Sequence, residues 1–106
     1  MKTIILSMVL VLSSVALAAE NHKLTLFQTS YMAGTELAAG DYTLVLDGAR
    51  VMLKKGSRTM AESDARVEAN DTPYSSTTIR YDTTDGGKYR ITEIHIGRTT
   101  TRIVLP

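Results

Sequence analysis

The chain of 106 residues contains no cysteine. No disulfide can therefore stabilise its fold, and no cysteine near the N-terminus can be acylated as a lipid anchor. The sequence shows no evident metal site either. A small domain of this kind depends on its hydrophobic core alone, unless a partner adds buried area.

The chain also lacks a surplus of charge of either sign. Twelve Lys and Arg residues are balanced by 11 Asp and Glu, for a formal net charge of +1. The basic residues are scattered among acidic ones and form no runs. A general binder of nucleic acid or of an anionic membrane needs excess cations to replace counterions. The composition therefore argues against both classes of partner.

Sequence motifs of catalysis are missing as well. Carboxylates show no pairing that suggests general acid and base catalysis, and no Gly-x-Ser-x-Gly elbow surrounds any of the five serines beyond the N-terminal segment: Ser30, Ser57, Ser63, Ser75 and Ser76. The two histidines, His22 and His95, make only a weak metal site. The stretch Asp82–Gly87 is similar to a calcium loop but lacks the alternating ligands and the distant glutamate, so a hairpin turn is favoured. We expect no enzyme activity, no cofactor and no metal.

The chain does have an N-terminal segment typical of export. Lys2 supplies a positive charge, Ile4–Leu12 is an apolar run, and Ala16–Ala18 forms a small-x-small cleavage site. We predict that residues 1–18 are a cleaved signal peptide, with cleavage after Ala19 as the near alternative. A transmembrane anchor is the other alternative, but the run falls short of the roughly 20 residues that span a bilayer.

Removal of the signal leaves residues 19–106, a chain of 88 residues with room for one small domain. Loss of Lys2 brings its basic and acidic residues to 11 each. We therefore expect an exported protein of about zero net charge, located in the periplasm or outside the cell, with no membrane span after cleavage.

Alternation of apolar and polar residues predicts a β-hairpin near the middle of the chain. Tyr42, Leu44 and Leu46 occupy every second position, and Val51 and Leu53 resume the pattern. Asp-Gly at positions 47 and 48 separates the two runs, and this pair is a strong signal for a tight hairpin turn. Upstream, we interpret residues 35–39, bracketed by glycines at 34 and 40, as a tight connection that places Leu37 in the core.

The same alternation predicts further strands at Lys23–Thr29, Thr59–Asn70, Thr77–Asp82, Lys88–Ile96 and Thr99–Leu105. Residues 59–70 indicate a weak or edge strand, with a helix over Thr59–Glu68 as the alternative. The apolar positions of residues 88–96 change parity, which indicates a bulge near Thr92 and Glu93 or a strand buried on both faces. Gly97 and Arg98 then turn the chain.

About seven short strands with turns every eight to twelve residues, and no long helical period after residue 18, predict an all-β fold. A small antiparallel β-sandwich or barrel fits this pattern. The sequence shows no linker and no internal repeat, so residues 19–106 form a single domain.

A combination of glycines and strand residues resembles a known group of proteins. The pattern Gly34-x-x-Leu37-x-Ala39-Gly40-x-Tyr42, then an Asp-Gly hairpin, and later Glu93-Ile94-x-Ile96-Gly97 before a terminal strand, is similar to short exported bacterial β-sandwich proteins of unknown function. The resemblance covers most of residues 19–106. It implies a small secreted β-sandwich and assigns no catalytic residues.

Two functions from different classes follow from the sequence. The first is a non-catalytic binding or accessory module that contacts another exported protein through Tyr74, Tyr81 and Tyr89, although these tyrosines could instead cover the edge of the core. The second is a structural subunit that self-associates by edge-strand pairing through Thr99–Leu105. A C-terminal strand paired within its own sheet is the alternative to that assembly.

Overall fold

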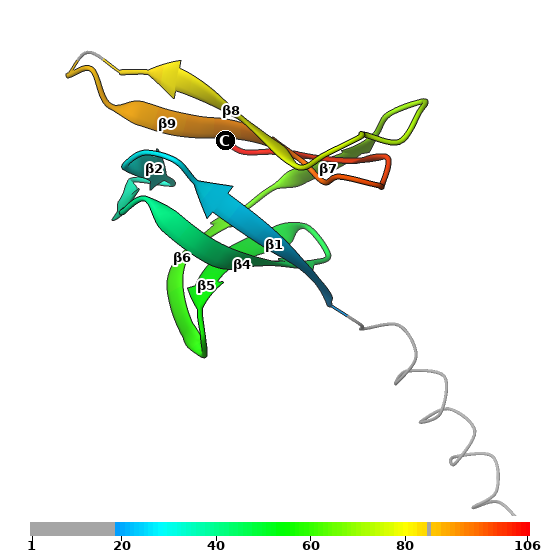
Figure 1. Cartoon of the computed structure of the whole chain (residues 1–106), viewed down its shortest axis with the longest axis horizontal. Coiled ribbons are helices and arrows are strands. Elements are labelled where there is room, and N and C mark those ends of the chain that lie inside the picture. Colours follow the sequence, from blue (N-terminus) through cyan, green and yellow to red (C-terminus); the bar gives the residue numbers. More distant parts are fainter. Residues whose placement is uncertain (1–18, 85) are drawn as a thin grey trace, which may run out of the picture.

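The computed structural model describes residues 19–84 and 86–106, so the predicted signal peptide lies outside the described residues. Within them the fold is all-β, as predicted (Figure 1). None of these residues forms a helix long and apolar enough to cross a membrane. The structure has ten strands where the sequence predicted about seven: β1 Glu20–Leu26, β2 Ser30–Met32, β3 Thr35–Leu37, β4 Gly40–Asp47, β5 Arg50–Lys55, β6 Arg58–Asp64, β7 Arg66–Ala69, β8 Thr78–Thr83, β9 Tyr89–His95 and β10 Thr101–Val104.

The strands form two sheets that lie as two layers in Figure 1. The first sheet has the order β1-β4-β5-β6, and the second has the order β3-β2-β9-β10-β7 with β8 paired to β9. Because β8 pairs along the whole of β9, strands β2 and β10 share the opposite edge of β9, one at each end. The β2–β9 pair is parallel and the others are antiparallel.

The hairpin predicted near the middle of the chain is confirmed as β4–β5. Asp47 pairs with Arg50, so Gly48 and Ala49 form a two-residue loop. Gly48 has a φ of 60°, which glycine adopts without steric cost. Tyr42, Leu44, Leu46, Val51 and Leu53 are all buried, as their alternation predicts.

The prediction of a tight connection over residues 35–39 is wrong for residues 35–37. Thr35–Leu37 is strand β3, which forms a hairpin with β2 through Ala33 and Gly34. These two residues have φ values of 50° and 79°, a left-handed pair that suits a two-residue hairpin loop. A positive φ is uncommon at alanine, and each strand has only three residues, too few to show alternation. Leu37 is in the core, as predicted.

The run from Thr59 to Asn70 is extended, so the helix alternative is excluded. It divides between β6, the last strand of the first sheet, and β7, the last strand of the second, in agreement with the predicted edge position. Ala65 lies between the two strands, and its backbone N–H donates to the carbonyl of Ala49 at 2.8 Å. This division and the β2–β3 hairpin account for the excess over seven strands.

The predicted bulge in the run from Lys88 to Ile96 is confirmed. Arg80 pairs with Glu93 while the next residue of β8, Tyr81, pairs with Ile91, so Thr92 is the extra residue. The Thr92 hydroxyl donates to the carbonyl of Arg80 at 3.2 Å. Because of this insertion, Ile91 and Ile94 are both buried between the sheets although they lie three positions apart, a step that would put them on opposite faces of a regular strand.

The core fills the space between the two sheets. Tyr42 is the one aromatic residue buried in it among the described residues, and its hydroxyl donates to the carbonyl of Ala38 at 2.6 Å. The Lys55 ammonium lies 4.4 Å from the centre of the Tyr42 ring. Burial raises the pKa of Tyr42. The tyrosine therefore ties the entry of β4 to the core.

The terminal strand is paired on both sides. β10 bonds to β9 along one edge and to β7 along the other, and the Leu105 N–H donates to the carbonyl of Thr92 at 2.9 Å. Residues 99–105 are therefore not a free edge, and assembly through them is not available in this fold. Thr99 and Thr100 belong to the turn before β10.

We expect Gly97→Ala to destabilise the domain by about 1–3 kcal/mol, as overpacking does. A Cβ atom at Gly97 would lie 2.5 Å from the backbone nitrogen of Thr77 and 2.7 Å from the carbonyl carbon of Ser76, so backbone has to move. Urea unfolding measures the loss. The matched control is Gly86→Ala, where the nearest atom is 3.8 Å away; equal stability of the two variants would contradict the close approach.

We expect Tyr42→Phe to cost about 1 kcal/mol, because the carbonyl of Ala38 loses its donor. Tyr31→Phe is the control. The Tyr31 hydroxyl donates to the exposed carboxylate of Glu36, and in the variant a water molecule can donate to that carboxylate instead. Thermal unfolding of both variants gives the comparison. A Tyr42→Phe variant as stable as wild type would show that the Tyr42 hydroxyl does not stabilise the fold.

Candidate functional site

Two strand edges border an open cleft along one side of the molecule. Within the described residues, β1 pairs only with β4, and β8 pairs only with β9. A cleft of about 410 Å³ lies between them, with walls from both edges: Lys23, Leu24, Thr25, Phe27, Thr77, Thr78, Ile79 and Tyr81. In Figure 1, β1 and β8 belong to different layers, so the cleft lies between an edge of the first sheet and an edge of the second.

The walls of this cleft are largely apolar. Phe27 follows the last residue of β1 and is 87% exposed, the most exposed large hydrophobic residue among those described. Ile79 and Tyr81 of β8 are half-buried and pack against the core. An exposed aromatic ring beside a half-buried apolar wall offers contact area to a partner.

The cleft continues along the first half of β1 into a second hollow of about 610 Å³. Its lining includes His22, Lys23 and Arg98 together with the hydroxyl residues Ser75 and Ser76. Lys23 and Thr77 line both hollows, so the two parts are continuous. We call the whole the β1–β8 cleft, with an apolar end at Phe27 and Tyr81 and a basic end at His22 and Arg98. The lining of both parts includes no Asp or Glu.

The structure brings together two of the three tyrosines proposed as partner contacts. Tyr81 lines the cleft, and the Tyr89 ring packs edge-on against it with 5.9 Å between centroids. Tyr74 lies elsewhere, stacked on His95 with 4.5 Å between centroids. Sequence analysis missed Phe27 as a surface residue. The adjacent pair Leu26-Phe27 could have indicated this, because neighbouring residues of a strand point to opposite faces and only one of the two can enter the core.

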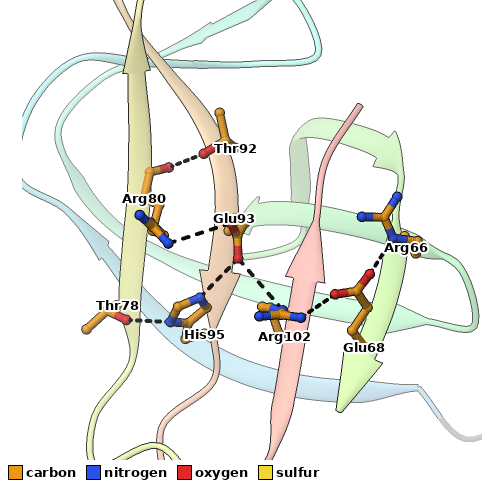
Figure 2. A network of polar contacts seen from close by, with 8 residues as sticks. All are labelled: Arg66, Glu68, Thr78, Arg80, Thr92, Glu93, His95 and Arg102. Atoms are coloured by element: carbon orange, nitrogen blue, oxygen red, sulfur yellow. Dashed lines mark hydrogen bonds and ion pairs between the residues drawn. The ribbon is translucent and has the colours of Figure 1, made fainter. Parts of the chain in front are cut away.

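The two histidines lie on strands of different sheets and have different surroundings. His22 lies in β1 and lines the basic end of the cleft. His95 lies in β9 within a network of polar contacts (Figure 2), where Nε2 meets Glu93 Oε1 at 3.2 Å and Nδ1 meets the Thr78 hydroxyl at 3.3 Å. Both ring nitrogens of His95 therefore have a polar partner, one on β8 and one on β9 itself.

The same network extends across the second sheet (Figure 2). Glu93 also approaches Arg80 of β8 and Arg102 of β10, at 3.9 and 3.8 Å. Arg102 donates to Glu68 of β7, which accepts a second bond from Arg66. These contacts link β8, β9, β10 and β7 in one chain of alternating charges.

The network shifts the pKa values of Glu68 and Arg102. Hydrogen bonds from Arg66 and from Arg102 hold the pKa of Glu68 below its ordinary value, and the Glu68 carboxylate raises the pKa of Arg102. The Nε atom of Arg102 is buried without a hydrogen-bond partner among the described residues. The contacts join side chains of four neighbouring strands and so help to hold these strands in register.

The described residues contain no group of three His, Asp or Glu residues placed to hold a metal ion. Asp82 and Thr83 end β8, and the described residues that follow turn the chain toward β9, as favoured above: the Thr84 N–H donates to the carbonyl of Lys88 at 2.9 Å. Asp82 itself pairs with Arg90 at 3.0 Å.

Comparisons of this chain with protein-family models, with curated proteins and with solved structures found no match. The resemblance to short exported bacterial proteins therefore stays a prediction. The function has to be argued from the cleft and the network themselves.

We expect Glu68→Gln to destabilise the domain at pH 7 and to lose this effect in acid. Because the pKa of Glu68 is lower in the folded state, its contribution is present above the unfolded value of about 4.3 and disappears as pH falls through the folded value. Urea midpoints at pH 7 and pH 3 measure the difference from wild type. Glu36→Gln changes the net charge equally, but its carboxylate accepts a bond from Tyr31 and not from an arginine. A pH-independent difference for Glu68→Gln would contradict the ion-pair network.

Proposed function

We propose that this chain is an exported, non-catalytic binding module that holds an extended segment of another protein in the β1–β8 cleft. The observation that carries the proposal is the pair of unpaired strand edges with an apolar cleft between them. Export is supported by the N-terminal pattern and by the resemblance to exported β-sandwich proteins. The absence of sequence motifs for catalysis also favours a binding role.

An extended segment suits the cleft because a strand edge presents a row of backbone donors and acceptors. A peptide that lies along such an edge bonds to it through its own backbone and places alternate side chains in the cleft. β1 has seven residues and β8 has six. A segment of about six residues, roughly 20 Å long, would therefore cover either edge.

The described part of this chain offers no such segment, and we propose that the segment comes from another molecule. Its ten strands are all paired within the two sheets. The connection 70–77 is held in place at Tyr74, whose N–H donates to Thr99 at 2.9 Å and whose carbonyl accepts from Arg98 at 2.7 Å.

The alternative function is a structural subunit that self-associates by edge-strand pairing. The same observation supports it, since β1 and β8 of one copy could pair with those of a second copy. Insertion of a single strand is favoured because the cleft lies between two layers, where a strand fits and a folded domain does not. Light scattering over a wide range of protein concentrations separates the two functions, and a concentration-dependent dimer would support self-association.

We expect Phe27→Ser to weaken binding of a peptide in the cleft by about tenfold, because a large exposed aromatic contact is lost. The fold should be unaffected, since the side chain is 87% exposed. Peptides that bind residues 19–106 are selected from two libraries of random octapeptides. In one library the octapeptide has further residues on both sides, and in the other it ends at a free carboxyl terminus. Fluorescence anisotropy then gives their affinity for each variant.

The matched control is Val67→Ser, which removes another exposed hydrophobic residue, 43% exposed on β7, away from the cleft. It should bind the selected peptides like wild type. Failure of both libraries to yield a binding peptide would refute the proposal. Equal weakening by Phe27→Ser and Val67→Ser would place the binding surface outside the cleft.

A further inference from the structure

We propose that the segment held in the β1–β8 cleft is the carboxyl-terminal tail of its protein, with the terminal carboxylate bound at the basic end by Lys23 and Arg98. This inference rests on the proposed function and deepens it. It follows from the direction of the two edges, from the charges along the cleft and from the conformation of Arg98.

The two edges run in the same direction along the cleft. At the basic end, residues 22 and 23 of β1 lie with residues 75–77, which precede β8. At the apolar end, Phe27 lies in the same hollow as Tyr81, and both come later in their segments. The arrows of β1 and β8 in Figure 1 also point the same way.

A segment in the cleft can therefore be antiparallel to β1 and β8 at once. Antiparallel pairs are somewhat more stable per residue than parallel pairs, and they make up most of the pairs in this fold. An antiparallel segment starts at the apolar end, beside Phe27 and Tyr81. Its carboxyl end then lies at the basic end, beside His22, Lys23 and Arg98.

The charge at that end matches a carboxylate. The basic side chains that line the whole cleft are His22, Lys23 and Arg98, with no Asp or Glu among the lining residues. Elsewhere on this nearly neutral chain, Arg50, Arg66, Arg90 and Arg102 are each paired with a carboxylate. Hydroxyls of Ser75 and Ser76 add donors beside the basic groups. Charge-assisted hydrogen bonds from such groups are the strong ones for a carboxylate.

Arg98 occupies a position where glycine would be expected. Its φ is 64°, in the left-handed region that is unfavourable for a long side chain. The turn is fixed on both sides, by the bond from the Arg98 N–H to Tyr74 and by the close approach of Gly97 to the backbone of Thr77. The chain thus keeps an arginine, at a cost in backbone strain, where its side chain lines the cleft.

The experiment uses the octapeptides selected on residues 19–106, each synthesised with a free carboxylate and with a carboxyl-terminal amide. We expect the library with free carboxyl termini to yield the binders. We also expect the free acid to bind about tenfold more tightly than the amide, the effect of one hydrogen bond to a charged group. Fluorescence anisotropy measures both affinities.

The test variant is Arg98→Gly, which removes the guanidinium and relieves the left-handed strain. It should have a melting temperature equal to or above that of wild type and lose most of the preference for the acid over the amide. The control is Arg58→Gly, which removes an exposed arginine at the start of β6 and should keep that preference.

The outcomes separate this inference from the proposed function. Binders that come only from the flanked library, or that bind equally as acid and amide, would overturn the inference and leave the cleft as a peptide site. Amidated peptides that bind tightly through an Asp or Glu side chain would show that the carboxylate is internal and overturn it too. The absence of binders from both libraries would overturn the proposed function itself.

Discussion

The pairing of β9 is the constraint on which the rest of the second sheet depends. This strand bonds to β8 along one edge and to β2 and β10 along the other, so segments far apart in the chain meet on it. The bulge at Thr92 allows Ile91 and Ile94 to enter the core while Glu93 and His95 contact the polar network. Without that bulge, Ile91 would lie on the same face as Glu93 and His95, opposite to Ile94.

The cleft and the network are two consequences of how the sheets end. In the second sheet, a series of ion pairs that begins at Arg80 and ends at Arg66 links β8 to the strands beside it. These ion pairs stabilise the position of the β8 edge that borders the cleft. In the first sheet, β1 is supported by β4 along its whole length. A cleft between two supported edges would be preorganised for the strand that we propose binds there, and this would lower the entropic cost of binding. A domain with no disulfide would also gain buried area from such a partner.

Much of the fold could be predicted from the sequence, because its signals are local. Alternation at Tyr42, Leu44 and Leu46 identified buried positions, and the parity change before Ile94 identified the bulge. The β2–β3 hairpin could not be predicted, since it depends on a left-handed Ala33 that no residue preference indicates. The site was harder still: Tyr81 and Tyr89 meet, whereas Tyr74 packs on His95 at another place.

The sequence by itself determined the all-β class, the residues that face the core and the turns at Gly48 and Gly97, because alternation and turn preference act within a few residues. Only the tertiary structure decided which strands are edges. β10 became an interior strand, whereas β1 and β8 are among the edge strands, and this depends on pairings between residues that are distant in the chain. The juxtaposition of Phe27 with Tyr81, and of Lys23 with Arg98, has the same origin. No local pattern encodes it, since each member belongs to a different sheet or turn.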